Sequence, residues 1–233
     1  MSNYFDNQRM NCISCQCKSP LFHFLSDKEL TLIQQNRTNV IFKPGETIRK
    51  QGTVMTHVLS LSSGLAKLYL EGIDQRNIIL RFVQPTNFIG GPGIYLDLMH
   101  HYTITALIES SVCFIDIQVF KNIIKQNVLF AEEFMKDFSK NTLSVYDRLI
   151  NLTQKQMAGR MADTLLYLFN DIFQGNKFPD LVSKQDLADL SAMSKNSGVK
   201  ILREFQNEGI IRITDHEMEL LNVEALKKIS KIG

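Results

Sequence analysis

The sequence predicts an α+β fold with an N-terminal antiparallel β-roll, a long helix and a C-terminal winged helix-turn-helix. Three observations predict it. From about residue 40 to residue 117, short runs of β-branched and aromatic residues are broken by Gly or Pro at roughly eight- to twelve-residue intervals, which is typical of antiparallel strands. Beyond Asp116 the apolar residues recur at helical spacing. The last part of the chain reads as short helices followed by two short strands.

The composition is that of a water-soluble globular protein. The chain has 233 residues, of which 44% are hydrophobic and 21% are charged, and its net charge is +2. This length accommodates one large or two modest domains, and the balanced charge neither supports nor excludes a polyanionic partner. The sequence has no run of about 18 apolar residues and no apolar signal-peptide region near its start. We therefore expect a cytoplasmic protein that has no membrane partner.

The expected roll begins with a short helix and continues as strands. Residues 21–36 carry apolar side chains at helical spacing, and Ser26 with Glu29 has the pattern of a capping box. The predicted strands are short apolar runs that end near glycine or proline, at residues 40–42, 58–61, 66–70 and 78–83. Strands of this length with regular turns favour an antiparallel roll of the double-stranded β-helix type.

The helix expected after Asp116 is apolar on two sides. The first stripe, at three- and four-residue spacing, contains Phe134, Phe138, Thr142, Val145, Leu149 and Leu152. The second stripe contains Phe130, Leu143, Tyr146 and Ile150. A helix with two apolar faces can pack on its own β-domain and on the same helix of a second subunit. The alternative is a helix that is buried inside a monomer.

The C-terminal segment has the pattern of a helix-turn-helix with a wing. A helix over residues 157–174 is followed by two short helices that open on Ser183 and Ser194 as N-caps. Residues 210–221 read as two strands around Asp215-His216, and a short helix covers residues 223–229. The strand pair would form the wing. The alternative is an ordinary helical hairpin whose polar residues are solvated caps.

Steep crossing of two short helices needs a small residue at the contact and an apolar core. Ala188 is the small residue, residues 191–193 form the turn, and the core residues are Leu187, Leu190, Ile201 and Leu202. The start of the second helix is predicted to be exposed. Residues 194–203 hold three cations and no acid, although residues 155–233 hold 11 of each. Weak non-specific DNA binding is therefore expected, with selectivity set by a few contacts.

The order of these parts resembles the cyclic-AMP receptor protein and fumarate-nitrate regulator (CRP/FNR) family. The resemblance covers residues 21–225 and includes Gly159-Arg160-Met161-Ala162 before Leu165-Leu166. The segment Ser183-Lys184-Gln185-Asp186-Leu187-Ala188 is similar to the family's Thr-Arg-Gln-Glu-Ile-Gly. The resemblance implies four parts: a flexible cysteine-containing segment (1–20), a cyclic-nucleotide-binding-like roll (21–130), a dimerisation helix (131–156) and a winged helix-turn-helix (157–233).

By resemblance the protein is a homodimeric transcription regulator that binds double-stranded promoter or operator DNA and RNA polymerase, and it is not an enzyme. Lysine suits guanine, asparagine suits adenine, and a serine at a helix start suits phosphate. The expected DNA-binding residues are Ser194, Lys195, Asn196, Ser197, Lys200 and Arg203. The expected dimer residues are Phe138, Val145, Leu149 and Leu152. One departure is Gly198, where the family usually has a β-branched residue, so the second helix is expected to be looser or shifted.

Cyclic AMP is not the expected ligand. The family's phosphate cassette has Gly-Glu after Phe-Ile and an Arg-Ser pair about ten residues later, but here both the Glu and the Arg are absent. An anion nest for another ligand is one expectation, and a tight turn beside a filled pocket is the other. The candidate pocket residues are Gly90, Gly91, Gly93, His101, Tyr102 and Tyr146.

The four cysteines resemble those of the redox branch of the family, which binds a 4Fe-4S cluster. Cys12 and Cys15 match its Cys-x2-Cys start and Cys113 matches its late cysteine, whereas Cys17 follows Cys15 too closely. Thiolates are the natural ligands of such clusters. A zinc half-site, or cysteines without any metal, are the alternatives.

Two further function classes stay open from the residues alone. A cupin-like metalloenzyme with an accessory helical domain would need convergent histidines, and the roll offers His57, His100 and His101 with Glu109. These histidines are predicted to be surface or loop residues, with a haem-ligand role for one of them as an alternative. A ligand-buffering protein that lacks DNA binding is the other class, and the polar start of the second short helix argues against it.

Overall fold

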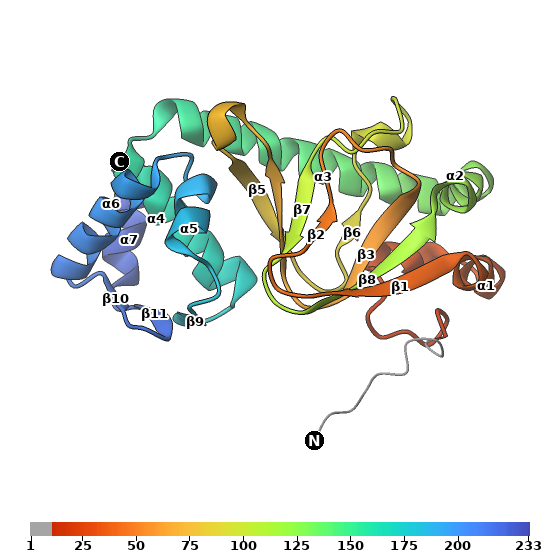
Figure 1. Ribbon diagram of the computed structural model, residues 1–233, viewed down its shortest axis with the longest axis horizontal. Coiled ribbons are helices and arrows are strands. Elements are labelled where there is room, and N and C mark those ends of the chain that lie inside the picture. Colours follow the sequence, from red (N-terminus) through yellow and green to blue (C-terminus); the bar gives the residue numbers. More distant parts are fainter. Residues whose placement is uncertain (1–10) are drawn as a thin grey trace, which may run out of the picture. The chain divides into compact units, whose positions relative to one another are not determined.

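The computed structural model describes residues 11–233, so residues 1–10 of the expected N-terminal segment lie outside the described residues (Figure 1). The chain divides into two compact units. One contains the described residues up to Leu68 together with Val83–Thr142. The other contains Tyr69–Phe82 and Leu143–Gly233.

The N-terminal part of the chain is built around two antiparallel sheets, and its segment Tyr69–Phe82 is counted with the second unit. Its early elements are the 3-10 turn η1 (Pro20–Phe24), α1 (Asp27–Gln35), β1 (Arg37–Phe42), β2 (Thr47–Arg49), β3 (His57–Ser63) and β4 (Ala66–Leu70). The later elements are η2 (Ile73–Gln75), β5 (Ile78–Val83), β6 (Phe88–Ile89), η3 (Pro92–Ile94), β7 (Thr103–Ala106), β8 (Ser110–Asp116) and α2 (Ile117–Gln126). The sheet orders are β1-β8-β3-β6 and β2-β7-β4-β5, which confirms the β-roll.

The helices at the start of the roll form where the sequence predicts them. Ser26 caps α1 and forms the complete capping box, because its hydroxyl accepts from the Glu29 N–H while the Glu29 carboxylate accepts from the Ser26 N–H at 2.8 Å. Asp116 caps α2 in the same manner through the N–H groups of Gln118 and Val119. These caps fix the points at which the chain leaves the turn or strand before each helix.

The long helix α3 (Val128–Gln154) begins inside the core of the roll. Phe130 is fully buried and Phe134 is 6% exposed. The Phe120 ring lies edge-on to both of them, with centroid distances of 5.7 and 5.4 Å. Phe130 and Phe134, which the sequence places on different stripes of the helix, therefore both belong to the core. The aromatic ring of Phe88 stacks on Phe120 at 5.0 Å and completes this cluster.

The second unit contains the helix-turn-helix and its wing. Its elements are α4 (Met157–Tyr167), a π-helical turn η4 (Leu168–Ile172), β9 (Lys177–Pro179), α5 (Lys184–Leu190), α6 (Lys195–Asn207), β10 (Ile211–Ile213), β11 (Glu217–Leu220) and α7 (Val223–Ile232). The wing is three-stranded, in the order β10-β11-β9. The sequence predicts β10 and β11 but misses β9, because three residues that end in proline give no strand pattern.

The prediction that the roll histidines are surface or loop residues is wrong for one of them. His57 lies on β3 and is partly buried. His100 lies in a loop, as expected, and is only 2% exposed. No helix among residues 11–233 is long and apolar enough to cross a membrane.

Candidate nucleic-acid interface and sensor sites

The helix pair α5–α6 is fixed by its caps and by the turn between the helices. Ser183 and Asp186 form a capping box, in which the Ser183 hydroxyl accepts from the Asp186 N–H at 3.1 Å. Ser194 caps α6 by accepting from the Ser197 N–H at 3.1 Å. Between the helices, Ala192 has φ of +47°, in the left-handed region that lets the chain turn sharply. These local signals produce the predicted helix-turn-helix.

The two helices meet at small residues, and the departure at Gly198 is accommodated there. Ala188 is fully buried, and a Cβ added to Gly198 would lie 3.4 Å from both the Ala188 Cβ and the Met161 Cε. Met161 from α4 therefore occupies the room that a larger residue at position 198 would need. The helix runs without interruption over Lys195–Asn207, so the predicted register is retained despite the glycine.

The start of α6 is exposed, as the DNA-binding prediction requires. Ser194, Lys195, Asn196, Lys200 and Arg203 are exposed, and Ser197 is partly buried beside the cap. These residues share one helix, so hydroxyl, amide and cationic donors lie on a single element that can enter a DNA groove.

One expectation about charge is wrong. The cations were expected to stand unopposed, but Glu204 lies one turn after Lys200, with 4.0 Å between Glu204 Oε1 and Lys200 Nζ. The two side chains are 52% and 80% exposed, so the pair is weak and easily broken. Glu204 nevertheless reduces the positive potential of this face.

The wing carries charged pairs instead of free cations. Arg212 on β10 donates to Glu219 on β11 at 2.9 Å, and Lys177 on β9 donates to Glu217 at 2.7 Å. The pair that joins Lys177 and Glu217 therefore links the unpredicted strand to the predicted hairpin. These pairs join the three strands of the wing to one another.

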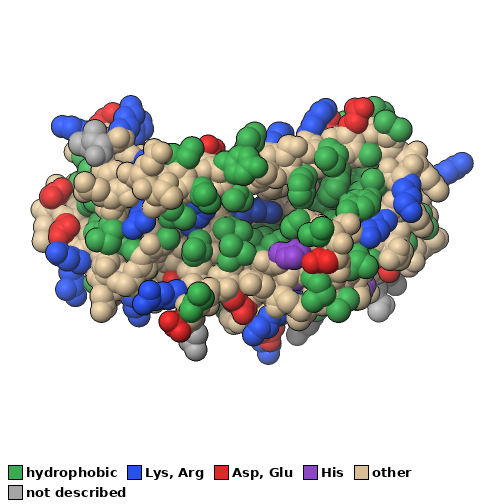
Figure 2. Space-filling view, turned by 90° about the horizontal axis from the view of Figure 1, so that it is seen from above, with side chains coloured by type: hydrophobic (Ala, Val, Ile, Leu, Met, Phe, Trp, Pro, Cys, Tyr) green, Lys and Arg blue, Asp and Glu red, His purple; other side chains and the backbone are tan. Residues whose placement is uncertain are grey.

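The outer face of α3 is apolar and unpartnered in the described chain. Val145 and Leu149 are 41% and 57% exposed, while Phe138 and Leu152 are partly buried. Figure 2 looks from above onto this helix of Figure 1 and shows hydrophobic side chains gathered along the face. The four residues predicted for the dimer interface follow one another at spacings of seven, four and three residues, which keeps them on one face of this helix.

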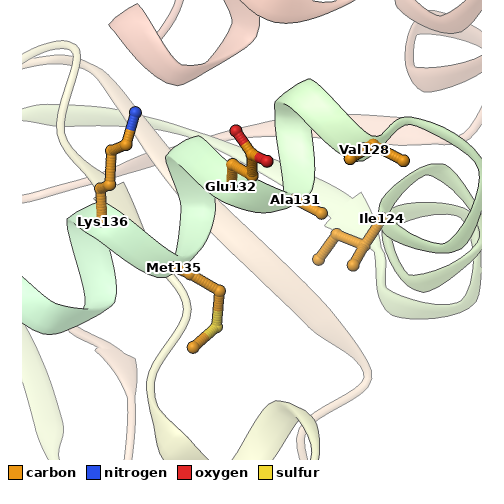
Figure 3. A pocket seen from close by; sticks show the side chains of 6 residues that line it. All are labelled: Ile124, Val128, Ala131, Glu132, Met135 and Lys136. Carbon is orange, nitrogen blue, oxygen red and sulfur yellow. The ribbon is translucent and has the colours of Figure 1, made fainter.

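A groove of about 390 Å³ extends the stripe toward the start of the helix (Figure 3). It is lined by Ile124, Val128, Ala131, Glu132, Met135 and Lys136. Val128, Ala131 and Met135 precede Phe138 at the same three- and four-residue spacing, so they continue its stripe. Met135, which the sequence analysis did not select, takes the outward position while its neighbour Phe134 points into the core.

The cysteines come together around an arginine that sequence reasoning missed. Arg37, at the start of β1, donates to Cys113 Sγ at 3.8 Å and also interacts with Cys12. The N–H of Cys12 donates to the Gln34 side chain at 2.9 Å, which holds the N-terminal segment against α1. Cys15 is close enough for its charge to act on the other three thiols.

The protonation of these thiols is set mainly by burial. Burial raises the pKa of the Cys113 thiol to about 11, although the neighbouring Arg37 guanidinium lowers it. Burial also raises the pKa of Cys12 and Cys17. Among residues 11–233, no three His, Cys, Asp or Glu side chains are arranged to hold a metal ion. Cys12 and Cys113 are therefore neighbours at Arg37, and the described thiols do not form a closed ligand set.

The glycine loop of the roll is packed against an aromatic side chain. Tyr102 is 8% exposed and its hydroxyl donates to the Gly90 carbonyl at 2.7 Å. Gly91 has φ of +94°, and a Cβ there would lie 2.6 Å from the Tyr102 hydroxyl. Gly93 approaches the Met99 carbonyl so closely that a Cβ would lie 2.0 Å from it. A Cβ at Gly90 would lie 2.7 Å from the Ile94 Cδ1, so close packing accounts for all three glycines.

The other two pocket candidates lie elsewhere. His101 is paired with Asp97 at 3.1 Å, and both side chains are about 40% exposed. Tyr146 is 58% exposed on the part of α3 that belongs to the other unit. The structure therefore brings Gly90, Gly91 and Tyr102 together, and it leaves His101 and Tyr146 on the surface of their units.

A β-roll followed by a long helix and a winged helix-turn-helix defines a two-domain transcription regulator. Residues 39–127 match the family model of the cyclic nucleotide-binding domain, and residues 159–229 match the Crp-like helix-turn-helix domain. The chain belongs to the CRP/FNR family of transcription regulators. It has the DNA-binding helix-turn-helix of that family.

Two curated proteins are similar to this chain in sequence, and solved structures share its fold. The chain is similar to the transcriptional regulatory protein btr of Bordetella pertussis, with 21% identity over 189 residues that cover 79% of this chain and 78% of that protein. It is 22% identical to the transcriptional activator protein FnrA of Stutzerimonas stutzeri over 187 residues, covering 77% and 75%. The structure of FixK2 from Bradyrhizobium japonicum superposes with a TM-score of 0.74 at 18% identity, covering 83% and 96%. A crp/fnr-family regulator from Eubacterium rectale gives 0.76 at 20% identity, covering 91% and 98%.

Proposed function

We propose that the protein is a homodimeric regulator that reads a specific DNA sequence with the exposed start of α6. The observation that carries the proposal is a capped helix whose donors face solvent while its other face is seated on Ala188 and Met161. Lys195, Asn196 and Lys200 contact base edges, Ser194 and Ser197 contact phosphate at the helix start, and Arg203 contacts phosphate one turn later. The regulator acts at promoters together with RNA polymerase.

Selection from random double-stranded DNA, followed by binding to the enriched sequence at fixed salt, tests the reading helix. We expect Lys200→Ala and Asn196→Ala each to weaken specific binding about tenfold, because a base contact contributes roughly 1–3 kcal/mol of discrimination. Lys227→Ala is the matched control, since Lys227 is also an exposed helical lysine beside a glutamate, at 3.1 Å from Glu224. Equal losses in Lys200→Ala and Lys227→Ala would show that α6 is not the reading element.

The dimer is proposed to form through the outer stripe of α3, including the groove at its start. The groove's occupant is the same helix of a second copy, because Val128, Ala131 and Met135 continue the spacing of the four seam residues without a break. The helix has 27 residues, which gives a seam of roughly 40 Å. An apolar stripe of this length is typical of a two-stranded coiled coil.

Sedimentation equilibrium tests this seam with two variants of similar exposure. Leu149 is 57% exposed on the stripe, whereas Leu143 is 60% exposed off the stripe. We expect Leu149→Lys to be monomeric because it places a charge in the seam, and Leu143→Lys to remain a dimer. A dimer in both variants, or a monomer in the unsubstituted protein, would contradict the assignment.

The roll is proposed to sense a signal other than cyclic AMP. The glutamate and arginine of the phosphate cassette are absent, and Tyr102 occupies the space beside Gly91 where an anion would approach. A DNA-binding titration with and without cyclic AMP checks this. A cyclic-AMP-dependent rise in operator affinity would contradict it.

A second candidate for the signal is redox state, favoured by Cys12 and Cys113, which both interact with Arg37, and by Cys15, which lies near the other three thiols. The similarity to FnrA identifies no ligand, and the thiols of the described residues are not arranged as a 4Fe-4S ligand set. We therefore derive no cluster chemistry. Anaerobic purification with iron and sulfide assays decides the question, because a colourless, iron-free product that still selects DNA excludes a cluster and leaves thiol chemistry.

A further inference from the structure

Arg148 links the long helix to the first helix of the helix-turn-helix. It lies on α3 in the second unit, and its Nη2 donates to the carbonyl of Leu190. Leu190 is the last residue of α5, where helix carbonyls lack an intrahelical partner. The arginine therefore caps the end of α5 from a different element, 42 residues earlier in the chain.

The environment of this arginine is costly for a cation. Burial lowers the pKa of Arg148 to about 10. Among the residues that the structure describes, no carboxylate pairs with it, and its Nε lies buried without a hydrogen-bond partner. A buried charge without a counter-ion is generally less stable than an apolar side chain of similar size. What an apolar residue cannot provide is a directional donor to the Leu190 carbonyl.

The contact at Leu190 is transmitted to α6 because α5, the turn and α6 are rigidly joined. The Ser191 hydroxyl, at the start of the turn, is buried within hydrogen-bond distance of the Leu187 carbonyl at 2.8 Å and of Thr164 Oγ1 at 2.9 Å. Ala188 and Gly198 bring the two helices into close contact. A displacement of the end of α5 therefore displaces the whole pair.

We propose that Arg148 is a positioning residue for DNA recognition. By donating to the Leu190 carbonyl, it sets the angle between α3 and the reading helix α6. The inference rests on the proposed function, since an angle between a dimerisation helix and a reading helix matters when two copies bind two half-sites. In a dimer this angle fixes the spacing between the two reading helices, and therefore the half-site spacing that the protein prefers.

The test measures operator affinity as a function of half-site spacing. The sequence enriched by the unsubstituted protein is prepared with its half-sites at the selected spacing, with one or two base pairs added or removed, and as a single half-site. Arg148→Met removes the donors while keeping an apolar stem of similar length. Arg148→Lys keeps the positive charge but loses the planar guanidinium. This variant is used for the same measurement if Arg148→Met does not fold.

We expect Arg148→Met to bind the selected spacing at least tenfold more weakly, to bind the altered spacings with a smaller loss, and to bind the single half-site within about twofold of the unsubstituted protein. Arg148→Lys should show a partial flattening of the same profile. A merely structural role would reduce binding equally on every DNA, including the half-site, and that result would overturn the proposal.

Tyr167→Phe is the matched control, because it removes a buried polar group beside Arg148 without touching Leu190. The Tyr167 hydroxyl accepts from the Phe82 N–H at 3.0 Å, and the two rings stack at 6.3 Å. We expect this variant to keep the spacing profile.

If the unsubstituted protein enriches no sequence, the proposed function fails and the inference with it. If it enriches paired half-sites and Arg148→Met keeps the same spacing profile, the inference alone is overturned.

Discussion

Acid is expected to destabilise the roll through His100. This side chain is 2% exposed, and neither ring nitrogen has a hydrogen-bond partner among the described residues. Burial, and then the positive charges of Arg49 and His101, lower the pKa of His100 from 6.5 to about 4. The folded protein therefore keeps the ring neutral at pH values where the unfolded chain already binds a proton.

The size and direction of the effect follow from this difference. Because the folded-state pKa lies below the unfolded value, the contribution to stability is fully present above about pH 6.5 and is lost as the pH falls toward 4. The difference between 6.5 and about 4, at roughly 1.36 kcal/mol for each pKa unit, corresponds to about 3 kcal/mol. This is a substantial part of the 5–15 kcal/mol that is typical for a folded domain.

The assay is the free energy of unfolding in urea, measured from pH 7 to pH 4 for the unsubstituted protein and for His100→Phe. Carboxylates titrate in the same range, so the informative quantity is the difference between the two proteins at each pH. We expect this difference to shift by about 3 kcal/mol in favour of His100→Phe between pH 7 and pH 4. His23→Gln, at an exposed position, is the control and should show no such shift. A pH-independent difference, or a His100 ring that titrates near pH 6.5 by NMR in the folded protein, would refute the reasoning.

The remaining predictions concern two glycines. Gly198→Ala should stabilise the protein by about 0.5–1 kcal/mol, because its Cβ fits at 3.4 Å from Ala188 and Met161 and alanine favours the helix. Gly198→Val should not be stabilised, because its larger side chain would collide with Met161. Thermal unfolding of the two variants checks this prediction. Gly91→Ala should destabilise the roll by more than about 1 kcal/mol, since φ is +94° and the new Cβ would lie 2.6 Å from the Tyr102 hydroxyl. A melting temperature equal to that of the unsubstituted protein would contradict this second prediction.

The parts of the fold that the sequence predicts well are those with local signals. Ser26, Ser183 and Ser194 each precede a helix whose cap depends only on neighbouring residues, and all three caps are present. The predicted strand runs are likewise observed as β1, β3, β4 and β5. The exposed start of α6 is also predicted from local sequence, because an amphipathic helix buries its apolar stripe and leaves its polar side in solvent.

The features that the sequence does not predict depend on contacts between distant residues. Arg37 and Cys113 are 76 residues apart, and Arg148 and Leu190 are 42 apart. An arginine on a strand or a helix is unremarkable by pattern, so its partner becomes visible only when the fold brings the two together. The burial of His100 is not predicted either, because the sequence around a loop histidine does not show which distant residues will cover it.

The proposed dimer seam and the proposed role of Arg148 both involve α3, and Arg148 lies beside the seam residues. At about 100° per residue, Arg148 lies roughly 60° from the line of the seam residues Val145, Leu149 and Leu152. When a straight helix of 3.6 residues per turn adopts the 3.5-residue repeat of a coiled coil, its side chains rotate by about 20° over one heptad. At a side-chain radius of about 6 Å this rotation moves the guanidinium by about 2 Å, which exceeds the tolerance of a hydrogen bond to the Leu190 carbonyl. Repacking of the proposed dimer seam would therefore either move the end of α5 together with α3 or break the hydrogen bond between Arg148 and Leu190. A signal that alters the seam can in this way alter the position of α6 without contacting α6.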